Sequence, residues 1–155
     1  MPTIRQALKN QMQMRLAKPN ATAVKINMYK PVEAYGVAEA IRRRPEVIKS
    51  CFVESLMIAD SVLMTHWRRD STIVALEEQK LLFDVFVSMV ADVAVATREA
   101  FPVEQRPLIM GDMPDGQNAS AEIAIAATER LAMAGAETVK IEVTSDAIYD
   151  VIEQV

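Results

Sequence analysis

Three carboxylates lie at the ends of predicted β-strands, and their type and position indicate a site for a divalent cation. Each follows or closes a short apolar stretch: Asp60, Asp112 and Glu142. If the strands are parallel, their carboxyl ends form one edge of a sheet, where parallel α/β proteins build their binding sites. Carboxylates that converge there repel one another unless a cation neutralises them, and oxygen ligands favour a hard ion such as Mg²⁺. We therefore predict that these three acids bind Mg²⁺.

A lysine accompanies the third acid. Lys140 precedes Glu142 by two residues, so that on a strand both side chains point to the same face. A lysine beside metal-binding carboxylates is well placed to hold an anionic group of a substrate. The acids also have a second interpretation, because acidic residues in strand-to-helix loops often stabilise helix N-termini. Their spacing leaves both interpretations open.

Length and composition limit the class of protein that can carry such a site. The chain has 155 residues, 51% hydrophobic and 25% charged, which suits a single α/β domain over residues 1–155. A net charge of -4 argues against a nucleic-acid partner. No apolar run approaches the roughly 20 residues that span a bilayer, and the start lacks the apolar segment of a signal peptide. With one cysteine, Cys51, and so no internal disulfide, we expect a cytoplasmic protein without a membrane partner.

Apolar periodicity predicts helices and strands in strict alternation. The predicted helices cover residues 3–17, 32–44, 75–100, a segment that ends before Gly135, and a last segment that begins at Thr144 or Ser145. The predicted strands cover residues 24–28, 51–59, 107–110 and 138–143, the third of them running into Gly111 and Asp112, and residues 60–73 are predicted to be a loop. Because parallel strands need helical crossovers, this order predicts a parallel sheet.

The same periodicity predicts which helix faces are buried. In residues 75–100 the predicted apolar stripe consists of Leu82, Val85, Phe86, Met89, Val90 and Val93. In the helix that precedes the fourth strand it consists of Ile123, Ala127, Leu131 and Ala134. Gly135 stands where a left-handed C-terminal cap is expected. Residues 118–120 are predicted to be a turn and helix cap.

Four segments, in this order, resemble the ketopantoate hydroxymethyltransferase family, also called 3-methyl-2-oxobutanoate hydroxymethyltransferase. They are IADSVLM, RRDSTI, LIMGDMP and AGAETVKIE. The opening TIRQALK and the segment INMYKPVEAYGVAEA are weaker matches to the family's N-terminal helix and first strand. The resemblance covers most of this chain, but only about the first half of a typical family member.

The resemblance implies a fold, a reaction and a set of site residues. The family fold is a (β/α)8 barrel that binds Mg²⁺. Its members transfer a one-carbon unit from 5,10-methylenetetrahydrofolate to 3-methyl-2-oxobutanoate in pantothenate biosynthesis. Carried over to this sequence, Asp60 and Asp112 would ligate Mg²⁺ and Glu142 would complete the acidic set. Ser61 and Lys140, together with Asp112, would contact the 2-oxo acid substrate.

The predicted architecture therefore corresponds to the first half of a barrel with an N-terminal helix. A (β/α)8 barrel takes about 250 residues, whereas this chain supplies four predicted strand–helix units. The family's general base is a glutamate of the later half, so no catalytic base is assigned here and turnover by this chain alone is not expected. A half-barrel leaves two edge strands unpaired, which predicts a homo-oligomer or a partner chain that supplies the second half.

Four alternatives stay open at this point. Four strands could form a flavodoxin-like open sheet, or two copies could pair their sheet edges. The chain could be a non-catalytic half-barrel whose role is assembly with a partner subunit. Among enzymes, it could be a related barrel lyase or mutase that acts on oxo acids through the same acidic cluster.

Overall fold

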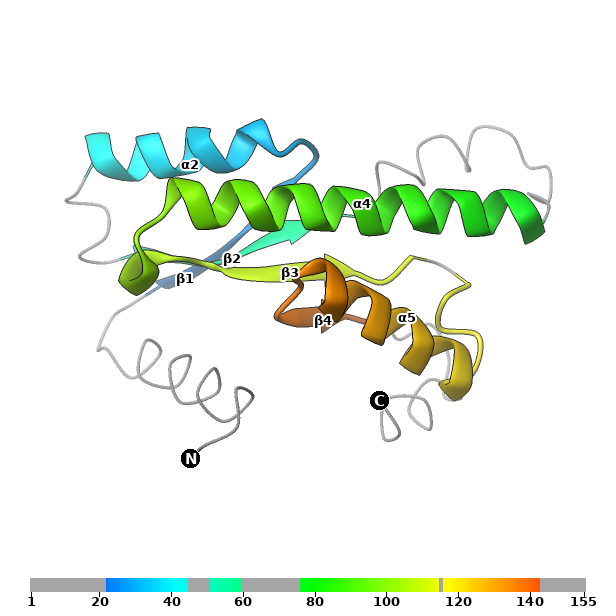
Figure 1. Cartoon of the computed structure of the whole chain (residues 1–155). Helices are drawn as coiled ribbons and strands as arrows, with labels where there is room; N and C mark the ends of the chain where they lie inside the picture. Colours follow the sequence, from blue (N-terminus) through cyan, green and yellow to red (C-terminus); the bar gives the residue numbers. More distant parts are fainter. Residues whose placement is uncertain (1–21, 45–50, 60–75, 115, 143–155) are drawn as a thin grey trace, which may run out of the picture.

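The computed structural model describes residues 22–44, 51–59, 76–114 and 116–142, which form one layer of parallel strands and one layer of helices (Figure 1). In chain order the elements are β1 (Thr22–Met28), α2 (Val32–Arg43), β2 (Cys51–Ile58), α4 (Leu76–Ala100), the 3-10 turn η2 (Val103–Gln105), β3 (Leu108–Asp112), α5 (Ala121–Ala134) and β4 (Thr138–Lys140). The predicted alternation of strands and helices is confirmed. The helix predicted over residues 3–17, the loop over 60–73 and the last helix lie outside the described residues.

The four strands lie in the sheet in the order in which they occur in the chain. All neighbouring pairs are parallel, and the spatial order is β1-β2-β3-β4. A flavodoxin-like sheet reverses its strand order near the middle, so the described strands do not have that arrangement. The sequential order is that of a (β/α) barrel opened between two strands, and it is consistent with the predicted partial barrel.

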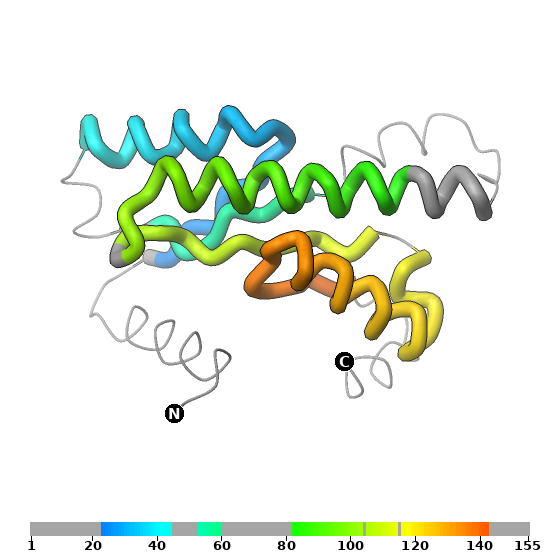
Figure 2. The backbone as a smooth tube through the Cα atoms, viewed as in Figure 1, coloured from blue at the N-terminus to red at the C-terminus, as the bar shows by residue number. Residues whose placement is uncertain are grey.

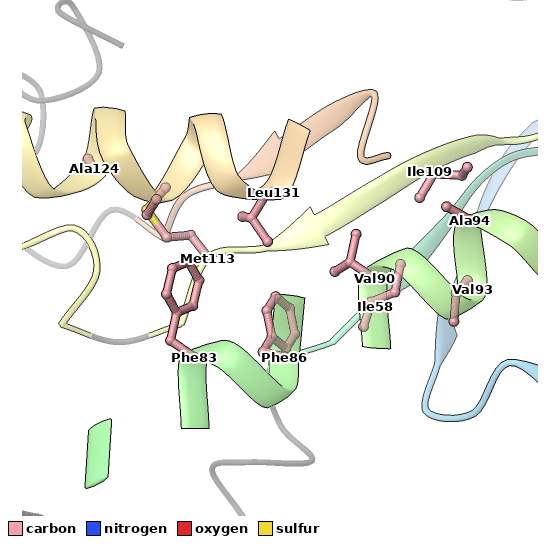
Figure 3. Packing of buried hydrophobic residues seen from close by; sticks show 11 residues of the cluster. Ile58, Phe83, Phe86, Val90, Val93, Ala94, Ile109, Met113, Ala124 and Leu131 are labelled. Carbon is pink, nitrogen blue, oxygen red and sulfur yellow. The ribbon is translucent and has the colours of Figure 1, made fainter. Parts of the chain in front are cut away.

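All three described helices cover the same face of the sheet. Ile58 of β2 and Ile109 of β3 share an apolar cluster with α4 and α5, while Met28 of β1 and Leu56 of β2 share a second cluster with α2 and α4. Figure 2 shows α2 and α4 running side by side above the strands, and Figure 3 shows the first cluster between α4, α5 and the sheet. Helices on a single face are what a barrel wall requires, because its other face lines the barrel interior.

A one-residue shift in the pairing of β1 with β2 decides which side chains face the helices. Val24 pairs with Val53, but the next residue, Lys25, pairs with Ser55, so Glu54 is passed over. An extra residue in one strand interrupts the alternation of its side chains. As a result Val53 and Leu56 both join the cluster beneath α2. Ser55 points to the opposite side, in register with Lys25.

The predicted apolar stripe of α4 is correct except at Val85. Leu82, Phe86, Val90 and Val93 are buried or pack against the first cluster, whereas Val85 is 45% exposed. Phe83, which the prediction passed over, is 4% exposed, and the Arg130 guanidinium lies 4.5 Å above its ring. The reason is that α4 contacts α5 as well as the sheet, so its buried surface is rotated toward α5.

Helix α5 also buries a slightly different face from the predicted one. Ala124, Ala127 and Leu131 are buried, whereas Ile123 is 42% exposed. Small residues let α5 approach β3 closely: the Leu131 side chain lies where a Cβ on Gly111 would come within 3.4 Å. Both predicted caps are confirmed, because the Ser120 hydroxyl accepts from the Ile123 amide and Gly135 has φ 107°.

The other side of the sheet, which we call the distal face, points away from α2, α4 and α5. By strand register it carries Lys25, Asn27, Ser55, Met57, Leu108, Met110, Asp112, Thr138 and Lys140. None of these residues belongs to the two apolar clusters of the described chain. Among the described helices, none has both the length and the apolar content that crossing a bilayer requires.

Candidate functional site at the carboxyl edge of the sheet

Two of the predicted site residues close adjacent strands. Asp112 is the last residue of β3 and Lys140 is the last residue of β4, and the two are paired in register. In-register residues of parallel neighbours project to the same face, so both side chains leave the distal face side by side. The structure thus brings two of the predicted site residues together at one edge of the sheet.

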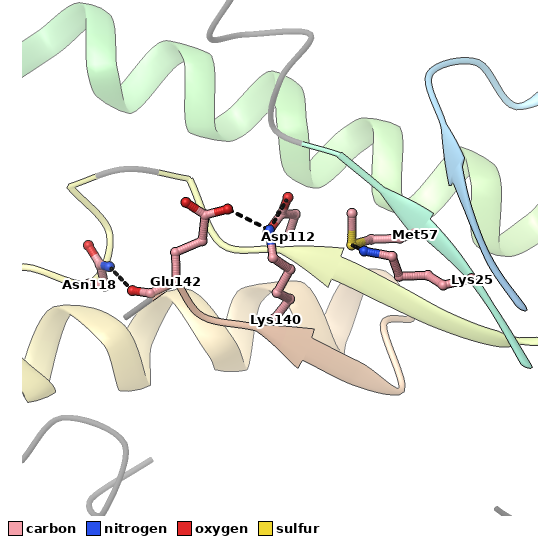
Figure 4. A network of polar contacts seen from close by, with 6 residues as sticks. All are labelled: Lys25, Met57, Asp112, Asn118, Lys140 and Glu142. Atoms are coloured by element: carbon pink, nitrogen blue, oxygen red, sulfur yellow. Dashed lines mark hydrogen bonds and ion pairs between the residues drawn. The ribbon is translucent and has the colours of Figure 1, made fainter. Parts of the chain in front are cut away.

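Lys140 is held by two carboxylates (Figure 4). Its Nζ lies 2.9 Å from Oδ1 of Asp112 and donates a hydrogen bond to Oδ2 at 3.1 Å. The same Nζ donates to Oε1 of Glu142 at 2.6 Å. The Asp112 side chain is 5% exposed and that of Glu142 63%, so one acid is buried and the other reaches solvent. A single cation is thus shared by the two acids.

The buried acid keeps unused capacity. Asp112 Oδ1 lies near the ammonium, but no group of the described residues donates a hydrogen bond to it in acceptable geometry. An ionised carboxylate has about four acceptor positions, and Lys140 uses few of them. Oδ1 is therefore available to a further donor or a metal ion. The helix-capping interpretation does not apply to Asp112, because Ser120 caps α5.

The electrostatics of the cluster favour the charged lysine. Partial burial lowers the pKa of Lys140, but the hydrogen bonds to Glu142 and Asp112, together with the charges of both acids, outweigh that effect. The pKa of Lys140 is consequently raised above its usual value. An opposite charge close by stabilises the ionised form, so this lysine is a permanent cation at neutral pH.

Strand β4 is shorter than predicted, and Glu142 lies beyond its end. The strand ends at Lys140, two residues before Glu142, rather than at residue 143. Two hydrogen bonds hold this segment: the Met113 amide donates to the Lys140 carbonyl at 2.9 Å, and Asn118 Nδ2 donates to the Glu142 carbonyl at 3.5 Å. Glu142 therefore approaches Lys140 from a loop and not from a strand.

The structure describes only some residues of the predicted acidic site. Asp60 and Ser61 lie outside the described residues, and within the described ranges no group of three or more His, Cys, Asp or Glu side chains is placed to hold a metal ion. The two described acids supply oxygen atoms and already share one cation, and Asp112 Oδ1 is an unused acceptor. That donor set fits a hard divalent ion as two of its ligands.

Sequence reasoning missed a second acid that β3 and β4 share. Glu137 lies at the opposite, amino edge of the sheet, where its carboxylate contacts Arg106 at 3.1 Å and accepts from the Ile109 amide at 3.1 Å. Its own amide donates to the Ile109 carbonyl at 2.7 Å. Its position directly before the fourth predicted strand was the available signal. These contacts hold the start of β3 in place, so Glu137 has a structural role.

Comparison with known proteins gives one partial relationship. No protein-family model matches the chain. Over 90 residues, 58% of this chain, it is 37% identical to a 3-methyl-2-oxobutanoate hydroxymethyltransferase of Stenotrophomonas maltophilia (strain R551-3). The alignment covers 28% of that relative, so the chain spans little more than a quarter of the length of the protein it matches.

Proposed function

We propose that this chain carries the metal- and substrate-binding edge of a Mg²⁺-dependent hydroxymethyltransferase that acts on a 2-oxo acid. The observation that carries the proposal is the Asp112–Lys140–Glu142 cluster at the carboxyl ends of adjacent parallel strands. The proposed reaction is the one for which the partial relative is named, a hydroxymethyl transfer with 3-methyl-2-oxobutanoate as the oxo acid. The one-carbon donor of the proposal is 5,10-methylenetetrahydrofolate.

In this proposal the acids of the edge bind the metal and the lysine binds the substrate. Asp112 and Glu142, with Asp60, would hold Mg²⁺, and Lys140, with Ser61, would hold the carboxylate of the oxo acid. When bound, the ion polarises the oxo group and acidifies the neighbouring C–H. Asp112 contributes from a position with 5% exposure, where its charge is screened less by water than at the surface.

The position of Lys140 also affects metal binding. In the described structure its ammonium takes the place between Asp112 and Glu142 that a divalent ion would share. If Asp112 and Glu142 held a divalent ion, Lys140 would give up at least part of its contact with the two acids. Its ammonium could then pair with the anionic end of the substrate.

Ligand-induced stabilisation tests the proposal without requiring turnover. A ligand that binds the native state raises the melting temperature, so Mg²⁺ together with 3-methyl-2-oxobutanoate should raise that of the wild-type chain. Asp112→Asn should abolish the shift, because it removes a charged metal ligand at nearly constant shape. Asp92→Asn, an exposed site on α4, is the matched control and should keep the full shift. An unchanged melting curve of the wild type would overturn the proposal.

A further inference from the structure

A second lysine lies on the distal face, away from the cluster already described. Lys25 of β1 is in register with Ser55 of β2, and its Nζ donates to the Met57 sulfur at 3.4 Å. Met57 pairs with Met110, two residues before Asp112 on β3. Figure 4 shows Lys25 and Met57 on one side of Asp112, with Lys140 and Glu142 on the other. The two lysines thus flank the same strip of the sheet.

The two ammonium groups differ in how they are compensated. Lys140 pairs with two carboxylates, whereas Lys25 forms no ion pair with any acid of the described residues. Its acceptor is a thioether, which is a weak one, and an ammonium has three donors to satisfy. Lys25 is therefore an exposed cation without a described carboxylate partner, and it faces the side of the sheet where the cluster lies.

The surface around Lys25 contains buried polar atoms that lack partners. Ser55 Oγ, in register with Lys25, is completely buried and forms no hydrogen bond with any described group. Thr138 Oγ1 also lacks a hydrogen bond in the described structure, but it lies on β4, three strands from Lys25 and in the row of Met57 and Met110. Buried polar atoms are nearly always hydrogen-bonded, so Ser55 Oγ is a polar atom beside Lys25 that the described chain leaves unsatisfied.

The spacing between Lys25 and the cluster matches a short molecule with two anionic ends. Asp112 lies two residues along β3 from the pairing partner of Met57, one strand away. A rise near 3.3 Å per residue and a strand spacing near 4.8 Å put the Met57 and Asp112 Cα atoms about 8 Å apart. The Lys25 ammonium lies against the Met57 side chain, so it is separated from the cluster by about the length of a small diacid.

We propose that Lys25 binds a second carboxylate of the substrate, so that this chain accepts a 2-oxo dicarboxylate in preference to an oxo acid with an apolar side chain. One carboxylate and the oxo group lie at the Asp112–Lys140 edge, and the distal carboxylate accepts hydrogen bonds from Lys25 Nζ. An ammonium–carboxylate hydrogen bond is roughly twice as strong as a neutral one, whereas an apolar group there would leave the ammonium with its thioether contact. This inference rests on the proposed function.

The test compares two probes on the full chain with Mg²⁺ present. Titration calorimetry gives the affinities for 2-oxoglutarate and for 3-methyl-2-oxobutanoate. The diacid should bind the wild type about tenfold more tightly, the value of one charge-assisted hydrogen bond. Lys25→Met should remove that advantage and leave the affinity for the monoacid unchanged. Lys25→Arg should keep most of the advantage, and Lys30→Met, in the exposed turn after β1, should keep all of it.

The outcomes separate this inference from the proposed function. If the monoacid binds and the diacid binds no better, the inference is wrong and the proposed function stands. If the diacid advantage persists in Lys25→Met, the second carboxylate is bound elsewhere and the inference is again wrong. If neither oxo acid binds the wild type, both are wrong.

Discussion

The two faces of the sheet are built on different physical grounds. The face toward the helices carries Leu56, Ile58 and Ile109, each with 0% exposure, and packs them against apolar side chains of α2, α4 and α5. The distal face carries two lysines and an aspartate, together with three buried polar atoms that lack hydrogen bonds within the described chain: Ser55 Oγ, Asp112 Oδ1 and Thr138 Oγ1.

This difference in composition indicates that the face toward the helices stabilises the fold and that the distal face carries the candidate binding site. Apolar burial stabilises a domain by about 25 cal/mol for each Å² removed from water. Unpaired polar atoms do the opposite, because each forgoes its bonds with water without replacement. Three of the four such atoms among the described residues lie on the distal face, the fourth being Thr128 Oγ1 of α5. The distal face thus gives up stability, as proteins do at sites that bind a ligand.

The largest expected effect comes from the face toward the helices. Phe86→Ala should lower the free energy of unfolding by about 3–5 kcal/mol, because it leaves a cavity among α4, α5 and the sheet. Urea unfolding followed by circular dichroism measures the change, and Phe86→Leu should cost less than about 1.5 kcal/mol. Val85→Ala is the control on the same helix at 45% exposure. Equal losses at the two positions would contradict the assignment of this face.

On the distal face, the largest loss of stability is expected from substitution of Lys140. Lys140→Met should lower stability by about 1–3 kcal/mol, because Asp112 stays buried without its cation. Lys140→Arg should retain most of that stability. The raised pKa of Lys140 sets the pH dependence: the contribution is complete below the unfolded value near 10.5 and is lost as the pH rises through the higher folded value. The difference between wild type and Lys140→Met should therefore be constant near neutral pH and shrink above it.

The same substitution should affect ligand binding in the opposite direction. Without the ammonium between Asp112 and Glu142, the negative potential at the edge increases, so the affinity for Mg²⁺ alone should rise several-fold in Lys140→Met. Titration calorimetry with Mg²⁺ measures this. A lower affinity in the variant would show that Lys140 supports the metal site instead of competing with the ion for it.

The smallest effect concerns the N-terminus of α5, which carries no residue of the distal face. Ser120→Ala should cost about 1 kcal/mol, because the Ile123 amide loses its hydrogen bond at the start of α5. Thermal unfolding measures it, and Ser88→Ala, the same chemical change in the exposed middle of α4, should leave stability unchanged or slightly higher. Oxo-acid binding should be the same in both variants, since neither residue lies on the distal face.

Much of the scaffold was predictable because the determining interactions are local. The ends of α4, the cap at Ser120 and the left-handed Gly135 follow from residues within a few positions of one another. The errors occurred where packing against another element decided the outcome. Phe83 is buried where Val85 was predicted to be, and Ala124 is buried where Ile123 was predicted to be. The reason is that α4 and α5 pack against each other as well as against the sheet.

The candidate site was predictable in its residues but not in its charge balance. The position of Asp112 at the end of a strand, and of Lys140 on the next strand, could be derived from alternation and parallel pairing, whereas the end of that next strand at Lys140 could not. The sequence predicted that a divalent ion neutralises the acids, whereas in the structure the positive charge of Lys140 already neutralises part of the charge of Asp112 and Glu142. That contact depends on the register of β3 with β4 and on a loop that returns Glu142 to the lysine.

The sequence by itself determined the alternation of strands and helices and the placing of Asp112 at a strand end, because period, capping and strand breaks are properties of neighbouring residues. The tertiary structure decided that all described helices lie on one face, that Lys25 faces the same side as Asp112, and that Lys140 joins two acids. Those facts depend on strand order, on the one-residue shift at Glu54 and on distances between residues far apart in the chain, which are fixed when the strands pair and the helices pack.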